Sequence, residues 1–388
     1  MKTAPLLGLL LLLGIVVLAG FSGHTAAQTP APFVVAWLPP WAQDEGKAAL
    51  SAHADIIGEL SPVWYALRSD GALQVRAGAR DPELLALVRQ AGILITPTIT
   101  NGFDGTRTDI VLNDALLRRA HIEAIVNEVL TYGYDGIDID YENMQPDDRD
   151  AFSLFMGELA AALHAHGKRL SVAVQAKTFD AWHYDGVGAL DYAALGGAVD
   201  EFRLMTYGWC WATGCVGSAP PGPIAPVHWM TRVIDYTRQR VPPSKIVLGV
   251  HLYGYDWSPV AAHAAGGTLS GHPPAPPPAG LPRSGHASQV NGDALTWNDV
   301  QDLIQTYAPT IEWWEADEQG LVREHWFRYG TDHAVTYADR DSVAARWQLS
   351  QAQGLAGIAL WYLGAEDPGV WQVLADAGPV LVPTPTSS

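Results

Sequence analysis

From residue 33 onward the sequence alternates short, β-rich apolar runs with longer stretches that have the apolar spacing of helices. This alternation favours parallel strands, because a helix between two strands returns the chain to the end of the sheet where the next parallel strand begins. The strand-like runs lie at 33–37, 55–66, 92–98, 134–142, 169–175, 202–207, 245–253 and 357–361. Eight such strands with intervening helices predict an α/β fold, the (β/α)8 or TIM barrel, whose functional residues lie at the carboxyl ends of its strands.

The interval between the seventh and the eighth strand is too long for an ordinary barrel connection. It covers roughly 100 residues, whereas loops in such folds usually have only a few. Its first part, 258–285, is rich in Pro, Gly, Ala and His, and its second part has β-like runs at 311–316 and 333–337. We therefore expect an α+β insertion at 258–344 on the rim of the barrel, where it would form a lid or a wall.

The two ends of the chain are predicted to lie outside the barrel. Lys2 is followed by an apolar stretch over residues 6–21 and then by small and polar residues, which is typical of a secretory signal peptide. We expect residues 1–27 to be this signal and the protein to be secreted; an uncleaved membrane anchor is the alternative. Residues 378–388 are expected to be a disordered tail, which leaves 28–377 for the catalytic barrel with its insertion.

Charge and cysteine content limit the partners of the chain. Lys and Arg number 23 against 41 Asp and Glu, a formal net charge of −18, and no basic tract is present to bind phosphates. Nucleic acid is therefore not an expected partner, and an anionic membrane surface would repel the chain. Cys210 and Cys215 are the two cysteines. In an exported chain they would form a local disulfide, with two free thiols as the alternative. We expect a monomer.

The segment DGIDIDYE at 135–142 carries the most specific chemical signal in the sequence. Side chains of a strand alternate between its faces, so that Asp138, Asp140 and Glu142 share one face. In a barrel that face is the interior, and the three carboxylates form a row that rises to the mouth, with Glu142 nearest the substrate. Confined carboxylates cannot all ionise at low cost, so at least one of them should hold a proton near neutral pH.

A carboxyl group that holds a proton near neutral pH can act as a general acid. We assign Glu142 as the proton donor to a leaving group, Asp140 as the neighbour that exchanges a proton or a hydrogen bond with it, and Asp138 as the buried member that tunes the pair. Metal binding by the three carboxylates is the alternative, but the adjacent loops lack an EF-hand spacing. We therefore expect neither a metal nor another cofactor.

At these residues the sequence resembles glycoside hydrolase family 18, whose signature DGxDxDxE on the fourth barrel strand is matched at every fixed position by residues 135–142. The resemblance extends over roughly residues 33–377. It is strongest to the branch of spore-cortex and germination N-acetylglucosaminidases, through short segments at 100–101, 204–207, 241–245, 252–257 and 361–364. Chitinases share the broader pattern.

The resemblance implies roles for further residues. In this family the acetamido oxygen of the substrate replaces the second carboxylate of ordinary glycosidases. Glu142 would then protonate the glycosidic oxygen while Asp140 orients the acetamido group. Tyr207 matches the family tyrosine that binds this group, and Trp361 matches the tryptophan under the reacting sugar. Further candidates for substrate contact, with packing as the alternative role, are Met205, Gln175, Tyr65 and Tyr253.

One position departs from the family pattern, because Gly208 follows Tyr207 where the family commonly has Asp. Asp140 and Glu142 are intact. We therefore expect a secreted glycoside hydrolase that cleaves β-1,4-linked N-acetylglucosamine glycans, in peptidoglycan or chitin fragments, with retention of configuration. The alternative is a non-catalytic, lectin-like barrel that binds the same glycans, but such proteins typically lose the acid at the position of Glu142.

Overall fold

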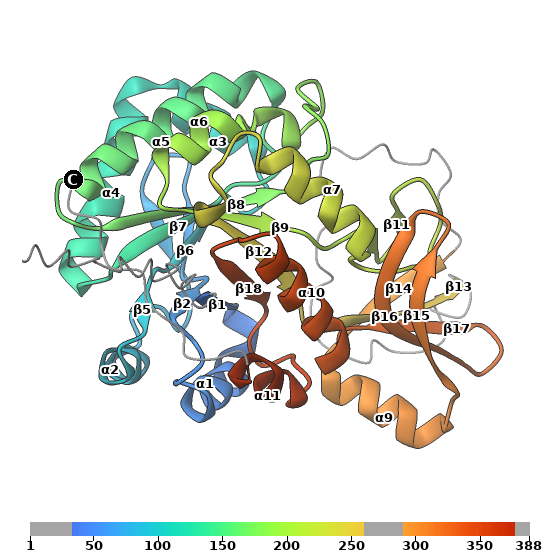
Figure 1. Ribbon diagram of the computed structural model, residues 1–388. Coiled ribbons are helices and arrows are strands. Elements are labelled where there is room, and N and C mark those ends of the chain that lie inside the picture. Colours follow the sequence, from blue (N-terminus) through green and yellow to red (C-terminus); the bar gives the residue numbers. More distant parts are fainter. Residues whose placement is uncertain (1–32, 260–289, 377–388) are drawn as a thin grey trace, which may run out of the picture. The chain divides into compact units, whose positions relative to one another are not determined.

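The computed structural model describes residues 33–259 and 290–376 (Figure 1). The predicted signal peptide at 1–27, the predicted tail at 378–388 and most of the Pro-rich segment at 258–285 lie outside these ranges. Within the described ranges, no helix combines the length and the apolar character that crossing a membrane requires.

Parallel strands, two of them broken in the middle, form a ring in the described part of the chain. They are β1 (Phe33–Leu38), β2 (Glu59–Pro62) with its continuation β3 (Tyr65–Leu67), β5 (Leu94–Ile95) with its continuation β6 (Thr98–Thr100), β7 (Gly136–Asp140), β8 (Arg169–Gln175), β9 (Glu201–Met205), β12 (Ile246–His251) and β18 (Gly357–Trp361). From β6 the order runs through β7, β8, β9, β12 and β18 to β1 and β2. The ring closes because β2 pairs with β5 while β3 pairs with β6. The prediction of a TIM-barrel-like fold is confirmed.

Helices follow the strands and cover the outside of this ring (Figure 1). They are α1 (Gln43–Ala52), α2 (Pro82–Ala91), α3 (Gly105–Asn113), α4 (Ala115–Tyr132), α5 (Arg149–His164), α6 (Tyr192–Ala198), α7 (Val227–Thr237), α10 (Arg340–Ala352) and α11 (Gly369–Ala375), with 3-10 turns at Pro40–Ala42, Pro146–Asp148, Val187–Ala189 and Pro243–Lys245. Asp81, Asp114 and Asp191 begin α2, α4 and α6, because each carboxylate accepts two backbone N–H groups of the first turn. Gly133 ends α4 with φ 66°, a conformation that costs glycine little.

Between β12 and β18 the chain forms a separate antiparallel sheet. Its elements are β13 (Gly254–Pro259), β14 (Val290–Leu295), α9 (Trp297–Tyr307), β15 (Ile311–Asp317), β16 (Gly320–Tyr329) and β17 (His333–Tyr337). The strand order is β14-β13-β17-β16-β15. Val300 and Leu303 of α9 pack with Phe327 and Val335 of the strands in a small apolar core of this sheet.

Glu324 of β16 ties this sheet to the barrel helices. Its carboxylate accepts the backbone N–H groups of Ile224 (2.8 Å) and Ala225 (2.7 Å), and the Arg346 guanidinium of α10 lies 2.7 Å from it. Glu324 and Arg346 are both fully buried. A buried ion pair is tolerable when its remaining hydrogen-bonding capacity is satisfied, and the two backbone donors supply this for Glu324.

Two short pairings complete the description. β4 (Leu73–Val75) adds an antiparallel edge to β3. β10 (Cys210–Trp211) and β11 (Gly214–Cys215) form a hairpin in which Cys210 and Cys215 are joined by a disulfide. This hairpin follows the end of β9, the strand that leads to Tyr207.

Candidate active site

The acidic segment forms β7 and its exit, and the register of the sheet sets its neighbours. Asp138 pairs with Thr98 of β6 and with Ser171 of β8. β7 ends at Asp140, and Glu142 lies two residues further on, at the carboxyl end of the strand. Asp138 is fully buried, whereas Asp140 and Glu142 are partly exposed. The row therefore rises from the barrel interior to its mouth.

Asp138 is saturated with hydrogen bonds. Its Oδ2 accepts from the Trp37 indole (3.0 Å) and from the Thr98 hydroxyl (2.9 Å). Its Oδ1 accepts from the Ser171 hydroxyl at 2.6 Å and lies 3.4 Å from the Arg203 guanidinium. A carboxylate offers about four acceptor positions, so these donors occupy nearly all of its capacity. Asp138 is fixed in place and has little capacity left for a ligand.

Arg203 extends this saturated network below Asp138. Its guanidinium forms ion pairs with Glu59 and Glu201 and donates to the Ser61 hydroxyl at 2.6 Å. Arg203, Glu59, Glu201 and Ser61 are all buried. Isolated buried charges are very costly, and they are stable here because each is paired. This end of the barrel interior is a structural ion cluster that the sequence analysis did not predict.

Asp140 and Glu142 have much less support. The Oδ1 atom of Asp140 is buried and has no hydrogen-bond partner among the described residues. Burial, together with the charges of Glu142 and Asp138, raises the pKa of Asp140 well above its ordinary value, against the opposing charge of Arg76. Burial raises the pKa of Glu142 to about 7, although its hydrogen bond with Gln175 lowers it. The pair therefore holds a proton near neutral pH, as a general acid must.

Asn101 fixes the backbone of Glu142. The Asn101 side chain accepts the Glu142 N–H at 3.1 Å and donates to the Glu142 carbonyl at 2.6 Å. The same amide donates to the Thr108 hydroxyl (2.9 Å) and accepts the Phe103 N–H (3.1 Å). Gln175 of β8 donates to Glu142 Oε2 at 3.1 Å. Both the backbone and the carboxyl group of Glu142 are thus held in position. Gln175, a candidate for substrate contact, lies beside the acid.

Trp361 forms an aromatic wall of the site at the end of β18. It is partly exposed and makes edge-on contacts with Trp37 and Trp41, with ring centroids 6.0 and 6.3 Å apart. Met205, at the end of β9, belongs to the same interior cluster. Because Trp37 also donates to Asp138, the wall and the acidic row are directly connected.

Tyr207 follows β9 and Tyr253 follows β12, the strand that lies between β9 and β18. Their rings make an edge-on contact with centroids 6.4 Å apart. Burial and the charges of Asp140 and Glu142 raise the pKa of Tyr207 well above its ordinary value, so that its hydroxyl keeps its proton and can donate it in a hydrogen bond. Gly208 follows with φ 82°, a conformation that a glycine adopts more easily than the Asp expected from the family pattern.

The structure does not bring Tyr65 to the carboxylates. Tyr65 pairs with Ile99, and Ile99 pairs with Ile139, so that all three point toward the helices instead of the interior. The Tyr65 hydroxyl is hydrogen-bonded to Glu128 (2.6 Å) and to Tyr134 (2.8 Å). Tyr65 therefore packs under α4, and the predicted substrate contact is replaced by this packing role.

Asn101 and Arg76 are site residues to which the sequence analysis gave no role. Asn101 directly follows β6, the strand that pairs with β7, and this adjacency is the signal that could have found it. Arg76 follows β4 and donates to the Thr100 hydroxyl at 2.7 Å, and its charge acts on Asp140. Arg76 could not be assigned from the sequence, because the short strand β4 that precedes it was not predicted.

The barrel fold and the acid pair at the mouth of its fourth strand, with Trp and Tyr side chains nearby, place the chain in the class of TIM-barrel enzymes that work by acid–base chemistry. The chain belongs to glycosyl hydrolases family 18, whose sequence pattern its residues 95–366 match. The resemblance seen in the acidic segment is therefore confirmed.

The relatives of the chain are bacterial lytic enzymes and chitinases. The chain is 30% identical to the cortical fragment-lytic enzyme of Bacillus subtilis (strain 168) over 284 residues. This matched region covers 73% of this chain and 59% of that enzyme. The chain thus spans less than two thirds of this relative. The crystal structure of a chitinase from Chromobacterium violaceum ATCC 12472 is 25% identical, with a TM-score of 0.73 over 89% of this chain and 99% of that one. The spore cortex-lytic enzyme SleL of Bacillus cereus has the same fold, with a TM-score of 0.74 at 24% identity over 90% of this chain and 75% of that one.

Proposed function

We propose that this protein hydrolyses β-1,4-linked glycans that contain N-acetylglucosamine, in peptidoglycan or chitin fragments, and that it acts outside the cytoplasm. The observation that carries the proposal is the Asp140–Glu142 pair, in which the raised pKa of Glu142 keeps a proton available at the mouth of the barrel. Membership of family 18 and the names of the relatives, which are lytic enzymes and chitinases, support glycan cleavage.

The first step breaks the glycosidic bond. The Glu142 carboxyl group donates its proton to the glycosidic oxygen, and the bond between that oxygen and C1 breaks. The acetamido oxygen of the same sugar attacks C1 and forms a cyclic oxazolinium ion, the substrate-assisted route given for this family. Asp140 accepts a hydrogen bond from the acetamido N–H and balances the positive charge, which suits a carboxylate oxygen that has no partner among the described residues. The Tyr207 hydroxyl donates to the acetamido oxygen and orients it.

The second step regenerates the enzyme. Glu142, now a carboxylate, accepts a proton from water, and the oxygen of that water attacks C1 from the side that the leaving group vacated. The oxazolinium ring opens, and the product has the retained β configuration. Trp361 packs under the reacting sugar throughout, since an indole face matches the apolar C–H face of a pyranose.

The proposal also covers the role of the inserted sheet and the compartment in which the protein acts. The sheet of β13–β17 would act as a wall beside the mouth, because the buried ion pair between Glu324 and Arg346 holds the sheet against α10. Action outside the cytoplasm is supported by the signal expected at 1–27 and by the Cys210–Cys215 disulfide, since disulfides persist in oxidising compartments.

The test uses paired substrates. Purified peptidoglycan and chitin oligomers are digested in parallel and the products are weighed by mass spectrometry. An aryl glycoside of N-acetylglucosamine oligomers should be cleaved with the β-anomer first in proton NMR, whereas the matching glucoside should be inert. An initial α-anomer or equal cleavage of the glucoside would contradict the mechanism. Tight binding of the oligomers without any cleavage would favour a lectin-like barrel.

A further inference from the structure

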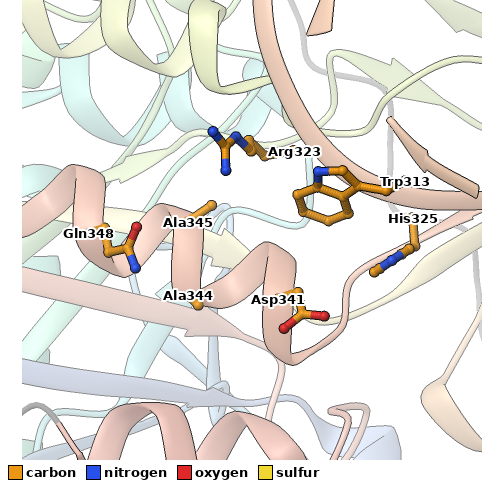
Figure 2. A pocket seen from close by; sticks show the side chains of 7 residues that line it. All are labelled: Trp313, Arg323, His325, Asp341, Ala344, Ala345 and Gln348. Carbon is orange, nitrogen blue, oxygen red and sulfur yellow. The ribbon is translucent and has the colours of Figure 1, made fainter. Parts of the chain in front are cut away.

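A cavity away from the acidic strand lies between β15, β16 and α10 (Figure 2). It has a volume of about 380 Å³ and is lined by Trp313, Arg323, His325, Asp341, Ala344, Ala345 and Gln348. This volume falls in the range of about 300–1,000 Å³ that small-molecule sites occupy. None of the lining residues belongs to the site described above.

One side of the cavity is aromatic and the other side is open. Trp313 stands opposite His325 in the β15–β16 pairing, with ring centroids 4.6 Å apart. The Trp313 indole N–H donates to Glu315 at 2.6 Å, which holds the ring. Figure 2 shows the Trp313 ring facing α10, where Ala344 and Ala345 leave room because their side chains are small. A half-buried indole thus presents a face to an open space.

Polar groups with unused capacity converge on the same space. His325 Nδ1 is bonded to Asp339 at 2.6 Å, so that its Nε2 is left for a ligand. Gln348 has no hydrogen-bond partner in the part of the chain that the structure describes. Asp341 is exposed and pairs only with the neighbouring Arg340, at 3.4 Å, among the described residues. An amide, a carboxylate and an imidazole can therefore each bind a hydroxyl group.

The charges around the cavity favour a neutral ligand. Arg323 is paired with Glu315 at 2.7 Å, and His325 is paired with Asp339, so that no unpaired cation is present to hold an anion. A metal ion is disfavoured as well, although His325, Asp339 and Asp341 lie close enough to bind one. Asp339 is already bonded to His325, and the guanidinium of Arg323 lines the same cavity and would repel a cation.

We propose that this cavity is a second glycan-binding site that takes one neutral pyranose residue, with the ring face on Trp313 and the hydroxyl groups on Gln348, Asp341 and His325. The choice of N-acetylglucosamine as that residue rests on the proposed function; the existence of a pyranose site does not. The site would hold the polymer to the enzyme without taking part in cleavage.

The test follows the tryptophan indole N–H signals by NMR while N-acetylglucosamine monosaccharide is added, because a monosaccharide cannot bridge two sites. The Trp313 signal, assigned by its loss in Trp313→Ala, should shift and saturate. The Trp314 signal is the control, since Trp314 is the next residue on β15 and points to the opposite face. Gln348→Ala should weaken the Trp313 titration several-fold. An unmoved Trp313 signal would overturn the proposal, and an equal shift with glucose would overturn the choice of an acetamido sugar.

Activity separates this proposal from the function of the barrel. Trp313→Ala should leave the cleavage of a short aryl oligosaccharide unchanged and slow the digestion of insoluble polymer several-fold, with recovery in Trp313→Phe. Trp314→Ala should show neither effect. Equal losses on both substrates, or equal effects of the two alanine variants, would overturn the second site while leaving the proposed function intact. A protein that cleaves no glycan but keeps the Trp313 titration would retain the second site and lose the proposed function.

Discussion

The lower and upper ends of the acidic row carry the same kind of side chain in opposite surroundings. Asp138 accepts hydrogen bonds from three side chains and lies beside Arg203, whereas Asp140 has a buried oxygen without a partner in the described structure. A satisfied carboxylate supports the fold, and an unsatisfied one is costly for the fold but available to a ligand. One strand therefore serves structure at its base and chemistry at its mouth, and each of the following changes tests that division.

The largest effect is expected at the mouth. Glu142→Gln removes the donated proton while keeping the shape and the Asn101 contacts, which involve only the backbone of Glu142. The kcat for the aryl oligosaccharide should fall by about 10²- to 10⁴-fold, the usual contribution of a general acid, while oligosaccharide binding is retained. Steady-state kinetics and calorimetric binding check both statements. Activity near that of the wild type would remove Glu142 from the mechanism.

The next effect is expected at the base. Arg203→Met leaves Glu59 and Asp138 buried without their paired cation and leaves Glu201 with Arg169 alone, and the free energy of unfolding should fall by about 3–5 kcal/mol. Urea unfolding measures this loss. Arg68→Met is the matched control, because the ion pair of Arg68 with Asp70 is exposed and screened by solvent, so its loss should change the free energy of unfolding little. Similar losses in the two variants would mean that the cluster below Asp138 is not structural.

A smaller effect is expected from the residue that holds the backbone of Glu142 at the mouth. Asn101→Ala removes both hydrogen bonds to the backbone of Glu142, so the acid is still present but less well placed. We expect kcat to fall by about 10-fold with little change in KM, because misplacement affects the transition state more than binding. Asn113→Ala in α3 is the control for loss of an amide. A rise in KM alone would show that Asn101 contacts substrate instead of positioning Glu142.

The smallest effect is expected on stability, because the folded protein keeps the Glu142 carboxyl group in surroundings that disfavour its ionised form. Because the pKa of Glu142 is raised from 4.5 to about 7 in the folded protein, the folded state binds this proton more tightly than the unfolded chain. The contribution of Glu142 to the free energy of unfolding is therefore lost as the pH rises from about 4.5 to about 7. Glu142→Gln should raise Tm relative to the wild type at pH 8 and have less effect at pH 4. An identical Tm difference at both pH values would mean that ionisation of Glu142 does not destabilise the folded protein.

Local features of the fold could be read from the sequence with good accuracy. The helix-like stretch between the second and third predicted strands forms α2, and the acidic segment forms β7 and its exit. The strand expected at 92–98 is broken, because Pro97 lacks the N–H that a continuous strand would need. The sequence left substrate contact and packing open for Tyr65, because strand two is also interrupted, before β3, and the alternation of side chains between the two faces cannot be followed across the break.

Long-range contacts could not be read in the same way. Arg203 and Glu59 are 144 residues apart, and only the closure of the ring brings them together. The same holds for Asn101 and Glu142, which come from adjacent strands separated by two helices. The sequence thus identified the acids from their spacing, whereas their supporting partners depend on the assembled sheet.

The buried hydrogen bonds and ion pair of Glu324 limit how the inserted sheet could be transplanted into another barrel. Glu324 depends on the backbone of Ile224 and Ala225 and on Arg346, and these three partners lie outside the sheet itself. A graft of residues 254–337 alone would bury an acid without its donors in the recipient. The transferable unit therefore includes the segment before α7 and the helix α10, and a chimera that carries only the sheet should be recovered in the insoluble fraction.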